Sequence, residues 1–444
     1  MTSDSLGNPV TLYEPTHLSV LNDFVEGLIA CEARVIAPLA VAETDHSPLL
    51  QAYAAALHMF AESPTAPANA QPYLARALAG AHQVSPREQR FIAAIAAWVA
   101  GDIAQAIRLH QEQAQEFPRD LASLKLGQYH CFNQGQTPAM LKLALSCLPA
   151  SADVAYVHGM AAFGWEQCHL LPRAEAAAQQ ALRMNRKEPW AQHALAHVQL
   201  TQGRLHEGLA FMREVSPTWV GLNSFMQTHN WWHLALFALE LGQHDEALRL
   251  CDEQVWGVVP EYSQDQIGAV SLLARLELAG ADVGARWQAL LPFLSHRVND
   301  QVLPFLDLHY LYGLARAESP LAASLLANIT AFAQNLPEAH PAKPVWHAVA
   351  LPAAQGLLAH ARGDYARAVL ELGSALPRLL EIGGSHAQRD LFEQIHLDAL
   401  LKCGQWNGAQ HRVQQSLNAQ PESMRLAALA RRVYAGLELT EFAT

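Results

Sequence analysis

Two pairs of histidines at helical spacing are the first residues in this chain that could do chemistry. His193 and His197 lie in the string WAQHALAHV, and His229 and His233 lie in QTHNWWHLALF, one expected helix pair later. Residues four apart lie on one face of an α-helix, so each pair presents two imidazoles together. Because the first helices of successive pairs lie side by side in a solenoid, we expect the four rings to converge on a metal ion or a small ligand.

The alternative is that these histidines pack in the interior or the groove without a ligand. The chain has 22 histidines, so an HxxxH pair arises easily by chance, and neither pair carries the Glu of the HExxH hydrolase motif. Most hydrolytic zinc sites also need a carboxylate, for which Glu166, Asp265 and Asp307 are candidates. The four histidines are therefore candidate metal ligands, with interior packing as the open alternative.

A second concentration of polar residues lies nearer the C-terminus. FLDLHYLYGLAR contains Asp307 and His309, and EIGGSHAQRDLFEQIHLDAL contains His386, Arg389 and Asp390 after two glycines. The start of a helix after a flexible turn offers N–H groups to an anion, and Arg389 could pair with a carboxylate or phosphate. The alternative is a glycine-rich turn in which Arg389 and Asp390 serve as caps.

The elements that must position these residues are helices that repeat at a fixed period. A small or slim residue falls early in each expected second helix, at Ala106, Met140, Ala174 and Gly208, in steps of 34 residues. This step is the tetratricopeptide period. Turn glycines precede the slim position by five residues in three repeats, and Cys168 takes the place of the glycine in the remaining one.

Looser helix pairs continue the pattern to the end of the chain. Their turn and packing positions are Gly242 with Ala247, Gly280, Gly363 with Ala368, and Gly404 with Ala409. No run of residues alternates with period two, so strands are not expected. We therefore expect an all-α, right-handed superhelical solenoid of helix-turn-helix pairs. It forms one domain over residues 18–435, with frayed termini at 1–17 and 436–444 and longer connections at 214–230 and 251–266.

Composition and charge narrow the functional classes. The net charge is −12 and no basic cluster is present, which argues against a nucleic-acid partner. The chain starts without a signal-peptide pattern and has no apolar run of about 18 residues, which argues against a membrane span. Six cysteines are scattered without a CxxC pair, as is typical of reduced thiols, so we expect a cytoplasmic protein.

The groove of a tetratricopeptide repeat is lined by four positions of each first helix. Counting from the turn glycines places aromatic and titratable residues at the lining positions of the concave face. His233 falls one residue away from a lining position. Such a groove suits a small polar ligand held by hydrogen bonds and aromatic walls. The alternative is that the same residues seal a narrow superhelix interior. The set is Lys125, Tyr129, Tyr156, Glu166, Trp190, His193, His197, His229 and Trp232.

Six strings resemble the tetratricopeptide repeat protein 38 family: YVHGMAAFGWEQ, EPWAQHALAHV, HNWWHLALF, PEYSQDQI, LDLHYLYG and GGSHAQRDLF. They occur in the family's order over roughly residues 120–400. The resemblance implies a superhelical fold and a cytosolic setting, and it implies no agreed reaction. The strings are rich in His, Asp and Arg, which implies a chemical site rather than a plain adaptor.

Two functional hypotheses follow. In the first, the chain is a hydrolase, a lyase or a binding protein for a small polar or anionic molecule, with a divalent metal as an optional cofactor. In the second, the groove is a scaffold for a peptide or protein partner, and a homodimer is left open. The catalytic candidates of the first hypothesis are His193, His229, His233, Asp307 and His309. Its ligand-binding candidates are His158, Glu166, Trp190, His197, Trp232, Asp265, His386, Arg389 and Asp390.

Overall fold

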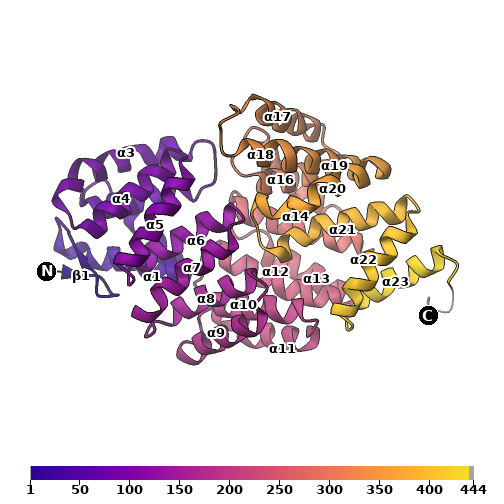
Figure 1. The fold of residues 1–444 in the computed structure, drawn as a ribbon, viewed down its shortest axis with the longest axis horizontal. Helices are drawn as coiled ribbons and strands as arrows, with labels where there is room; N and C mark the ends of the chain where they lie inside the picture. Colours follow the sequence, from indigo (N-terminus) through magenta and orange to yellow (C-terminus); the bar gives the residue numbers. More distant parts are fainter. Residues whose placement is uncertain (1, 440–444) are drawn as a thin grey trace. The chain divides into compact units, whose positions relative to one another are not determined.

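The computed structural model describes residues 2–439, and almost all of their regular structure is helical (Figure 1). The strands found there, β1 (Thr2–Ser3) and β2 (Pro9–Val10), form one short antiparallel ladder with Thr2 opposite Val10. The prediction of an all-α solenoid of helix pairs is confirmed. Among these residues, no helix combines the length and the apolar character that a bilayer crossing needs.

Contacts divide the chain into two compact units. The first unit comprises residues up to 195 together with 218–226, and the second comprises 196–217 together with the chain from 227 onward. The boundaries fall inside α10 (Pro189–Thr201) and just inside α12 (Ser224–Glu240). The single domain expected over residues 18–435 stays a prediction.

In the first unit, antiparallel pairs of helices follow one another, with α2 packed on α3, α4 on α5, α6 on α7 and α8 on α9. Short 3₁₀ segments join several of them at Pro15–His17, Ala33–Ala40, Ala81–Gln83, Leu148–Ala150 and Ser216–Trp219. The helices are α1 (Leu18–Ala30), α2 (Pro48–Met59), α3 (Ala66–Gly80), α4 (Pro86–Val99), α5 (Ile103–Glu116), α6 (Leu121–Asn133), α7 (Thr137–Cys147), α8 (Ala155–Gln167), α9 (Leu171–Met184) and the start of α10.

The second unit continues with less regular pairs. It contains two π-helical segments, Cys251–Val255 and Trp346–Ala350, and 3₁₀ segments at Ser295–Arg297 and Leu376–Ile382. Its further helices are α11 (Leu205–Val215), α13 (His244–Leu250), α14 (Ser263–Leu278), α15 (Arg286–Leu294), α16 (Pro304–Arg316), α17 (Leu321–Asn335), α18 (Lys343–Val345), α19 (Leu351–Ala361), α20 (Tyr365–Ala375), α21 (His386–Lys402), α22 (Trp406–Ala419) and α23 (Met424–Gly436).

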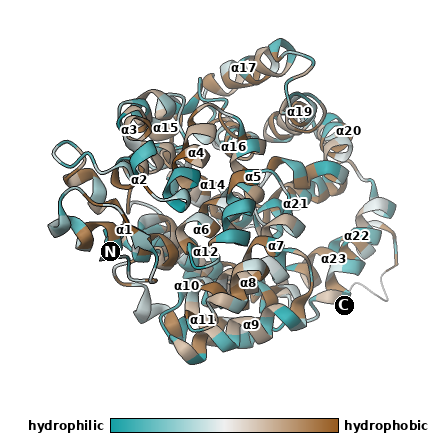
Figure 2. Ribbon diagram, turned by 60° about the vertical axis from the view of Figure 1, so that its left-hand side comes forward, coloured by the Kyte–Doolittle hydropathy of each residue, from teal (hydrophilic) through white to brown (hydrophobic). Residues whose placement is uncertain are grey.

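The slim positions of the repeat are buried, as the period predicts. Ala106 and Ala174 are fully inaccessible and Met140 is 1% exposed. At Gly208 a Cβ would run into the ring of Phe237, so only glycine allows α11 to approach α12 this closely. Hydrophobic and hydrophilic residues share the same helices, as expected for amphipathic elements packed in pairs (Figure 2).

The turn position of the third repeat differs from the prediction by one residue. Gly101, Gly135 and Gly203 adopt φ of +79°, +64° and +71°, and the residue with positive φ in the third repeat is His169 (φ +58°), not Cys168. Cys168 is the C-cap of α8, and the left-handed residue is the one after the cap. A residue with a Cβ pays about 1 kcal/mol for that conformation.

The long connections expected from the sequence are partly helical. The interval 214–230 is wrong as one connection, because α12 already starts at Ser224 after the 3₁₀ segment Ser216–Trp219. Leu222 forms an isolated antiparallel bridge with Glu32 in the first unit, so the segment before α12 is tied down. The interval 251–266 holds the π-helical turn and then the first residues of α14.

The second unit folds back on its own beginning. The carboxylate of Glu422, just before α23, accepts a hydrogen bond from the N–H of Leu205 at 3.0 Å. Glu240 at the end of α12 accepts one from Ser423 and another from Arg425 Nε, the latter at 2.7 Å. The last helix pair is therefore attached to α11 and α12, more than 180 residues earlier.

Candidate functional site

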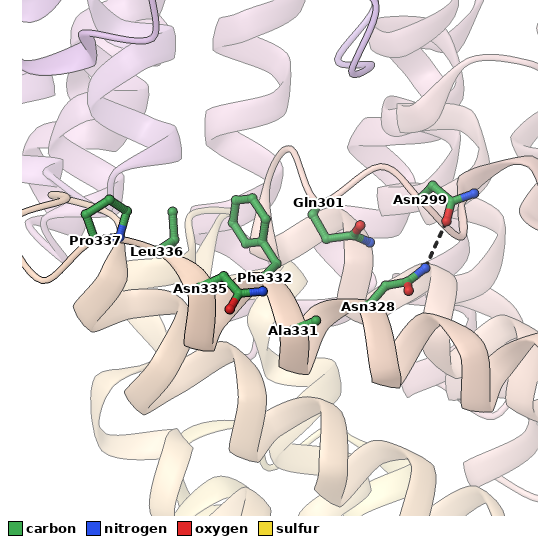
Figure 3. Close-up of a pocket in the computed structure, with 8 residues that line it drawn as sticks. All are labelled: Asn299, Gln301, Asn328, Ala331, Phe332, Asn335, Leu336 and Pro337. Carbon is green, nitrogen blue, oxygen red and sulfur yellow. Dashed lines mark hydrogen bonds between the residues drawn. The ribbon is translucent and has the colours of Figure 1, made fainter.

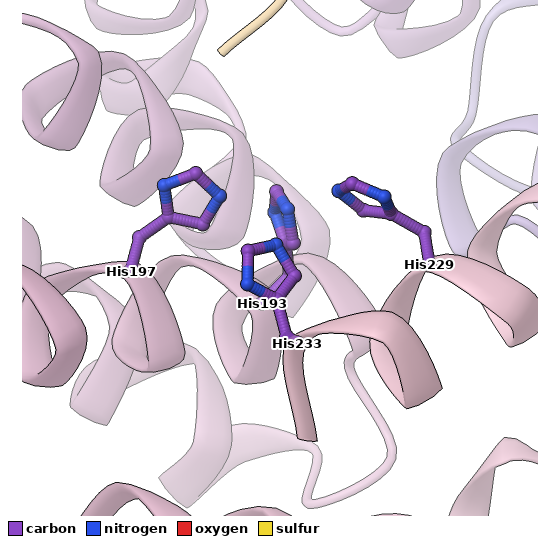
Figure 4. Close-up of side chains that lie close together, drawn as sticks. All are labelled: His193, His197, His229 and His233. Atoms are coloured by element: carbon purple, nitrogen blue, oxygen red, sulfur yellow. The ribbon is translucent and has the colours of Figure 1, made fainter. Parts of the chain in front are cut away.

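Three imidazoles meet between α10 and α12 in the second unit (Figure 4). His197, His229 and His233 each have a ring nitrogen within 4.8 Å of those of the other two. The ring of His233 lies 4.5 Å from that of His197 and 4.7 Å from that of His229, measured between centroids. All three side chains are at most 8% exposed. The predicted convergence of the two helices' histidines therefore holds for these three.

His193 lies one turn before His197 on α10, in the part of the helix that belongs to the first unit. The i, i+4 spacing places both side chains on the same face of this continuous helix, and Figure 4 draws His193 with the other three. Within its own unit, the His193 ring packs against Phe163 at 5.1 Å and Trp190 at 5.3 Å. His193 thus remains a candidate fourth ligand on the spacing of α10.

Burial keeps His229 neutral. Desolvation, helped by the neighbouring His197, lowers the pKa of His229 to about 3. A neutral imidazole has a free lone pair on one nitrogen, which is the form that binds a metal ion or accepts a proton. Trp232 stacks on the His229 ring with 5.2 Å between centroids and nearly parallel planes, which fixes the ring orientation.

A buried arginine that the sequence analysis did not single out lies behind Trp232. Arg275 of α14 is 1% exposed, and its guanidinium carbon lies 5.3 Å from the centroid of the Trp232 ring. It donates to the carbonyl oxygen of Ala387 at 2.7 Å and to Ser271, and burial lowers its pKa to about 10. An arginine in the mostly apolar string SLLARLELAG was the available signal. Its bonds anchor the start of α21 to α14.

His386 begins α21 and reaches the histidine cluster. Its Nε2 lies 3.5 Å from Nδ1 of His197, and the two rings meet edge to face. The first N–H groups of α21 are served by Ser385 and Gln388, which form a complete capping box. Of the residues predicted in this string, His386 therefore joins the cluster.

Arg389 and Asp390 make contacts around the glycine turn and the start of α21. The Arg389 guanidinium donates to the carbonyl oxygens of Gly384 and Gly383. Asp390 is half exposed, accepts from Gln394 and lies 3.9 Å from Arg275. These contacts match the alternative of a capped glycine turn more closely than that of an anion clamp.

Among the described residues, Asp265, Asp307 and His309 do not join the histidine cluster. Asp265 accepts from the N–H of Val259 at 2.9 Å and from Thr228, so it ties the preceding loop to α12. Asp307 and His309 are two residues apart on α16 and thus on opposite faces. His309 Nδ1 donates to the Phe305 carbonyl at 2.7 Å, and burial lowers the pKa of His309 to about 4.

Asp307 is a buried acid without an ordinary hydrogen bond. It is 1% exposed, and neither carboxylate oxygen has a hydrogen-bond partner of normal geometry within residues 2–439. Burial and the neighbouring Asp300 raise the pKa of Asp307 well above its usual value. Burial thus favours the neutral form of Asp307, which is a poor orienter of an imidazole.

Three further candidates lie in the first unit. His158 bonds through Nε2 to the carbonyl of Ala152 at 3.0 Å, at the start of α8. Glu166 is fully buried and accepts from Gln167 at 2.7 Å. Trp190 donates its indole N–H to Cys31 Sγ at 3.0 Å and is covered by Lys125.

Most of the residues that the sequence places on the concave face are buried in the structure. Glu166, His193, His197 and Trp232 are at most 1% exposed, and Trp190 is 8% exposed. This burial agrees with the alternative that the aromatic and titratable set seals the superhelix interior. An ion fits among such side chains more readily than a peptide does.

A surface pocket of about 440 Å³ lies elsewhere in the second unit, along α17 (Figure 3). Amides of Asn299, Gln301, Asn328 and Asn335 line it beside Phe332, and Asn328 donates to Asn299 at 2.9 Å. None of the residues predicted for the site lies in its lining. The pocket is thus separate from the histidine cluster.

Comparisons with known proteins describe the fold. No protein-family model matches the chain. Among solved structures, the human IFIT1 dimer with PPP-AAAA is 12% identical over 95% of this chain and 92% of that one, with a TM-score of 0.42. The IFIT1 monomeric mutant with Gppp-AAAA is 14% identical over 95% and 93%, with a TM-score of 0.41. A structure of Naa15/Naa10 bound to HypK-THB is 13% identical over 96% and 66%, with a TM-score of 0.26. Likeness at this level does not extend to function.

Proposed function

We propose that this helical repeat protein binds a divalent transition-metal ion through His197, His229 and His233. The observation that carries the proposal is the approach of three buried ring nitrogens from α10 and α12 to within 4.8 Å of one another. Tetrahedral ligation at 2.0–2.1 Å places ligand nitrogens about 3.3 Å apart. Ligation would draw the three nitrogens from within 4.8 Å of one another to that spacing.

The surroundings of the histidine cluster favour binding of a metal ion. Burial keeps His229 in its neutral form at pH 7, and the indole of Trp232 stacks on its ring. His386 lies within 3.5 Å of His197 and can orient that ring from the second shell of the metal. Imidazole ligands suit zinc, copper, nickel and iron rather than calcium or magnesium.

A metal ion at this position supplies Lewis-acid chemistry to a small polar or anionic molecule. In that case His386 and whichever histidine is not ligated would carry protons, which fits hydrolysis or elimination. We also propose that the protein is cytoplasmic, that it has no nucleic-acid partner and that it is related to the tetratricopeptide repeat protein 38 family.

Metal titration of the chelator-stripped chain tests the proposal. We expect one equivalent of Zn²⁺ or Co²⁺ to bind, and a hundredfold excess over Kd to stabilise the fold by about 2.7 kcal/mol. The double substitution His197→Gln and His233→Gln should abolish binding. His158→Gln is the matched control, because His158 bonds to a backbone carbonyl away from the cluster. Lack of binding by the native chain, or equal binding by the double variant, contradicts the proposal.

A second candidate function is that of a scaffold whose partner is another copy of the chain. Val220 is 89% exposed in the segment before α12, and Ile36 is 60% exposed in the adjoining 3₁₀ segment. The two segments are joined by the bond from Ala33 N–H to the Gly221 carbonyl. Light scattering of the native chain against Val220→Asp tests this: a dimer that the substitution dissociates supports it, and a monomeric native chain excludes it.

A further inference from the structure

A partly exposed lysine lies against an indole ring in the first unit. Lys125 is in the middle of α6, and its Nζ is 3.2 Å from the centroid of the Trp190 ring. The indole N–H of Trp190 in turn donates to Cys31 Sγ at 3.0 Å. Glu188 precedes α10 and contributes a negative charge beside the lysine. An amine, an indole, a thiol and a carboxylate thus converge from three elements.

The amine of Lys125 has no hydrogen-bonded or ion-paired anion. Within residues 2–439, no carboxylate oxygen lies within 4.0 Å of its Nζ, and no acceptor forms a hydrogen bond with it. Lysines this enclosed are normally paired with an acid. The Lys125 residue as a whole is partly exposed, while its amine lies against the indole of Trp190.

The surroundings of Lys125 are fixed by backbone contacts. Cys31 ends α1 in the left-handed conformation with φ of +53°, and the N–H of Asn223 bonds to its carbonyl at 2.7 Å. Glu188 is held by the N–H groups of Trp190 and Ala191, and Gly159 leaves space for its carboxylate. A non-glycine residue in that conformation persists only where its surroundings enforce it. The arrangement is therefore rigid.

Burial also changes the protonation of the amine. It lowers the pKa of Lys125 to about 8, although Cys31 and Glu188 act in the opposite direction. Burial likewise raises the pKa of Glu188 to about 8. At pH 7 about a tenth of the Lys125 amines are then neutral, against fewer than about one in a thousand for an ordinary lysine.

We propose that Lys125 is a nucleophilic amine that condenses with the carbonyl group of a small aldehyde or ketone, with the face of Trp190 as the wall on which the planar adduct stacks. The nitrogen lone pair forms the N–C bond, and the carbonyl π electrons move to oxygen, which takes a proton. The resulting carbinolamine loses water, the oxygen leaving with two protons, and leaves an imine. The condensation changes the oxidation state of no atom and needs no metal.

Reductive trapping tests the proposal directly. The folded chain is treated with acetaldehyde and cyanoborohydride at pH 7, and the modified lysines are identified by peptide mass mapping. Lys142 and Lys402 are exposed and serve as internal controls. We expect Lys125 to be modified at least about tenfold faster than either control in the folded chain, and at the same rate in urea.

A substitution separates reactivity from mere accessibility. Glu188→Gln keeps an acceptor for the two N–H groups and cannot ionise. Because burial raises the pKa of Glu188 to about 8, this carboxyl is mostly protonated at pH 7, so the trapping rate at pH 7 should change less than about twofold. The pH midpoint of trapping should fall, because the native carboxylate ionises near that midpoint and favours the charged amine. Lys125→Arg keeps the positive charge on the indole and should give no adduct at this position. Modification of Lys125 no faster than Lys142 in the folded native chain overturns the proposal, whether or not the chain binds a metal.

Discussion

His197 Nδ1 and His386 Nε2 lie 3.5 Å apart although 189 residues separate them in the chain. The contact exists because the start of α21 is anchored on α14 through the bond from Arg275 to the Ala387 carbonyl. A ring at this distance from a proposed ligand orients it and tunes its basicity. The C-terminal part of the second unit therefore completes the surroundings of the histidine cluster.

The first prediction concerns His386. If the cluster binds a metal, His386→Ala should weaken Zn²⁺ affinity about 10- to 100-fold without removing binding, because it deletes an orienting contact and no ligand. Competition titration with a chromophoric chelator measures the change. His411→Ala on the exposed face of α22 is the control and should leave the affinity unchanged. Complete loss of binding in His386→Ala would instead make His386 a ligand.

The second prediction is a loss of stability in mild acid. Burial lowers the pKa of His229 to about 3 and those of His110 and His309 to about 4, against about 6.5 in the unfolded chain. The unfolded chain thus binds more protons below pH 6.5, so stability is complete above that pH and falls as pH drops toward 4. Each histidine contributes up to about 1.4 kcal/mol per pH unit.

Urea unfolding at pH 7.5, 6.0 and 5.0 measures this loss, above the range where most carboxylates titrate. His309→Leu should reduce the slope between pH 6 and 5, because it removes one of the three groups. A midpoint that does not change between pH 7.5 and 5.0 would contradict the buried neutral state of these histidines.

The third prediction concerns Asp307, whose effect on stability has the opposite pH dependence to that of the buried histidines. The folded-state pKa of Asp307 is raised, so its contribution to stability is complete below about pH 3.9 and is lost as pH rises toward the folded-state value. Asp307→Asn cannot ionise and should be more stable than the native chain at pH 7 by at least about 1 kcal/mol. Thermal unfolding at pH 5 and pH 8 checks it: the difference between the two proteins should grow with pH. Asp252→Asn, in an exposed ion pair with Arg286, is the control and should not gain stability.

The fourth prediction concerns the turn before α21. Gly384 has φ of +77°, and a Cβ there would lie 2.5 Å from the Phe305 ring. Gly384→Ala should cost about 2–4 kcal/mol, from backbone strain and displacement of the ring together. Gly257→Ala has a similar φ of +94° with open space around it and should cost only about 1 kcal/mol. Equal losses in the two variants, measured by denaturant unfolding, would show that the Phe305 contact is unimportant.

The repeat architecture was predictable because it depends on local spacing. Ala106, Met140 and Ala174 are buried as the 34-residue step requires, and Asp364 caps α20 as the GDYARAV string suggests. The error at Cys168 was a miscount by one residue: five residues before Ala174 stands His169, which adopts the left-handed conformation where the other repeats have glycine. The start of α12 was missed although a capping signal precedes it: the side-chain oxygen of Asn223 accepts from the N–H of Met226 at 2.9 Å, as an N-cap does.

The site was predictable only where both partners lie on neighbouring helices. His197, His229 and His233 share one pair of helices, so their spacing was informative, although the groove count placed His233 off the lining. The count assumes a first helix of ordinary length, and α12 runs for 17 residues. Arg275 meets Ala387 across 112 residues, and Lys125 meets Trp190 across a stack of repeats, which no local pattern encodes.

The bonds from Glu422 and Arg425 to α11 and α12 have a consequence for how the chain unfolds. A linear array of repeats loses structure from its free end, one pair at a time, because each pair depends only on its neighbours. Here the terminal pair α22–α23 is attached to helices near the beginning of the second unit. Unfolding of α22 and α23 must therefore break contacts that also hold α11 and α12. These contacts couple the last helix pair of the second unit to its first helices. We expect the second unit to unfold as one cooperative event.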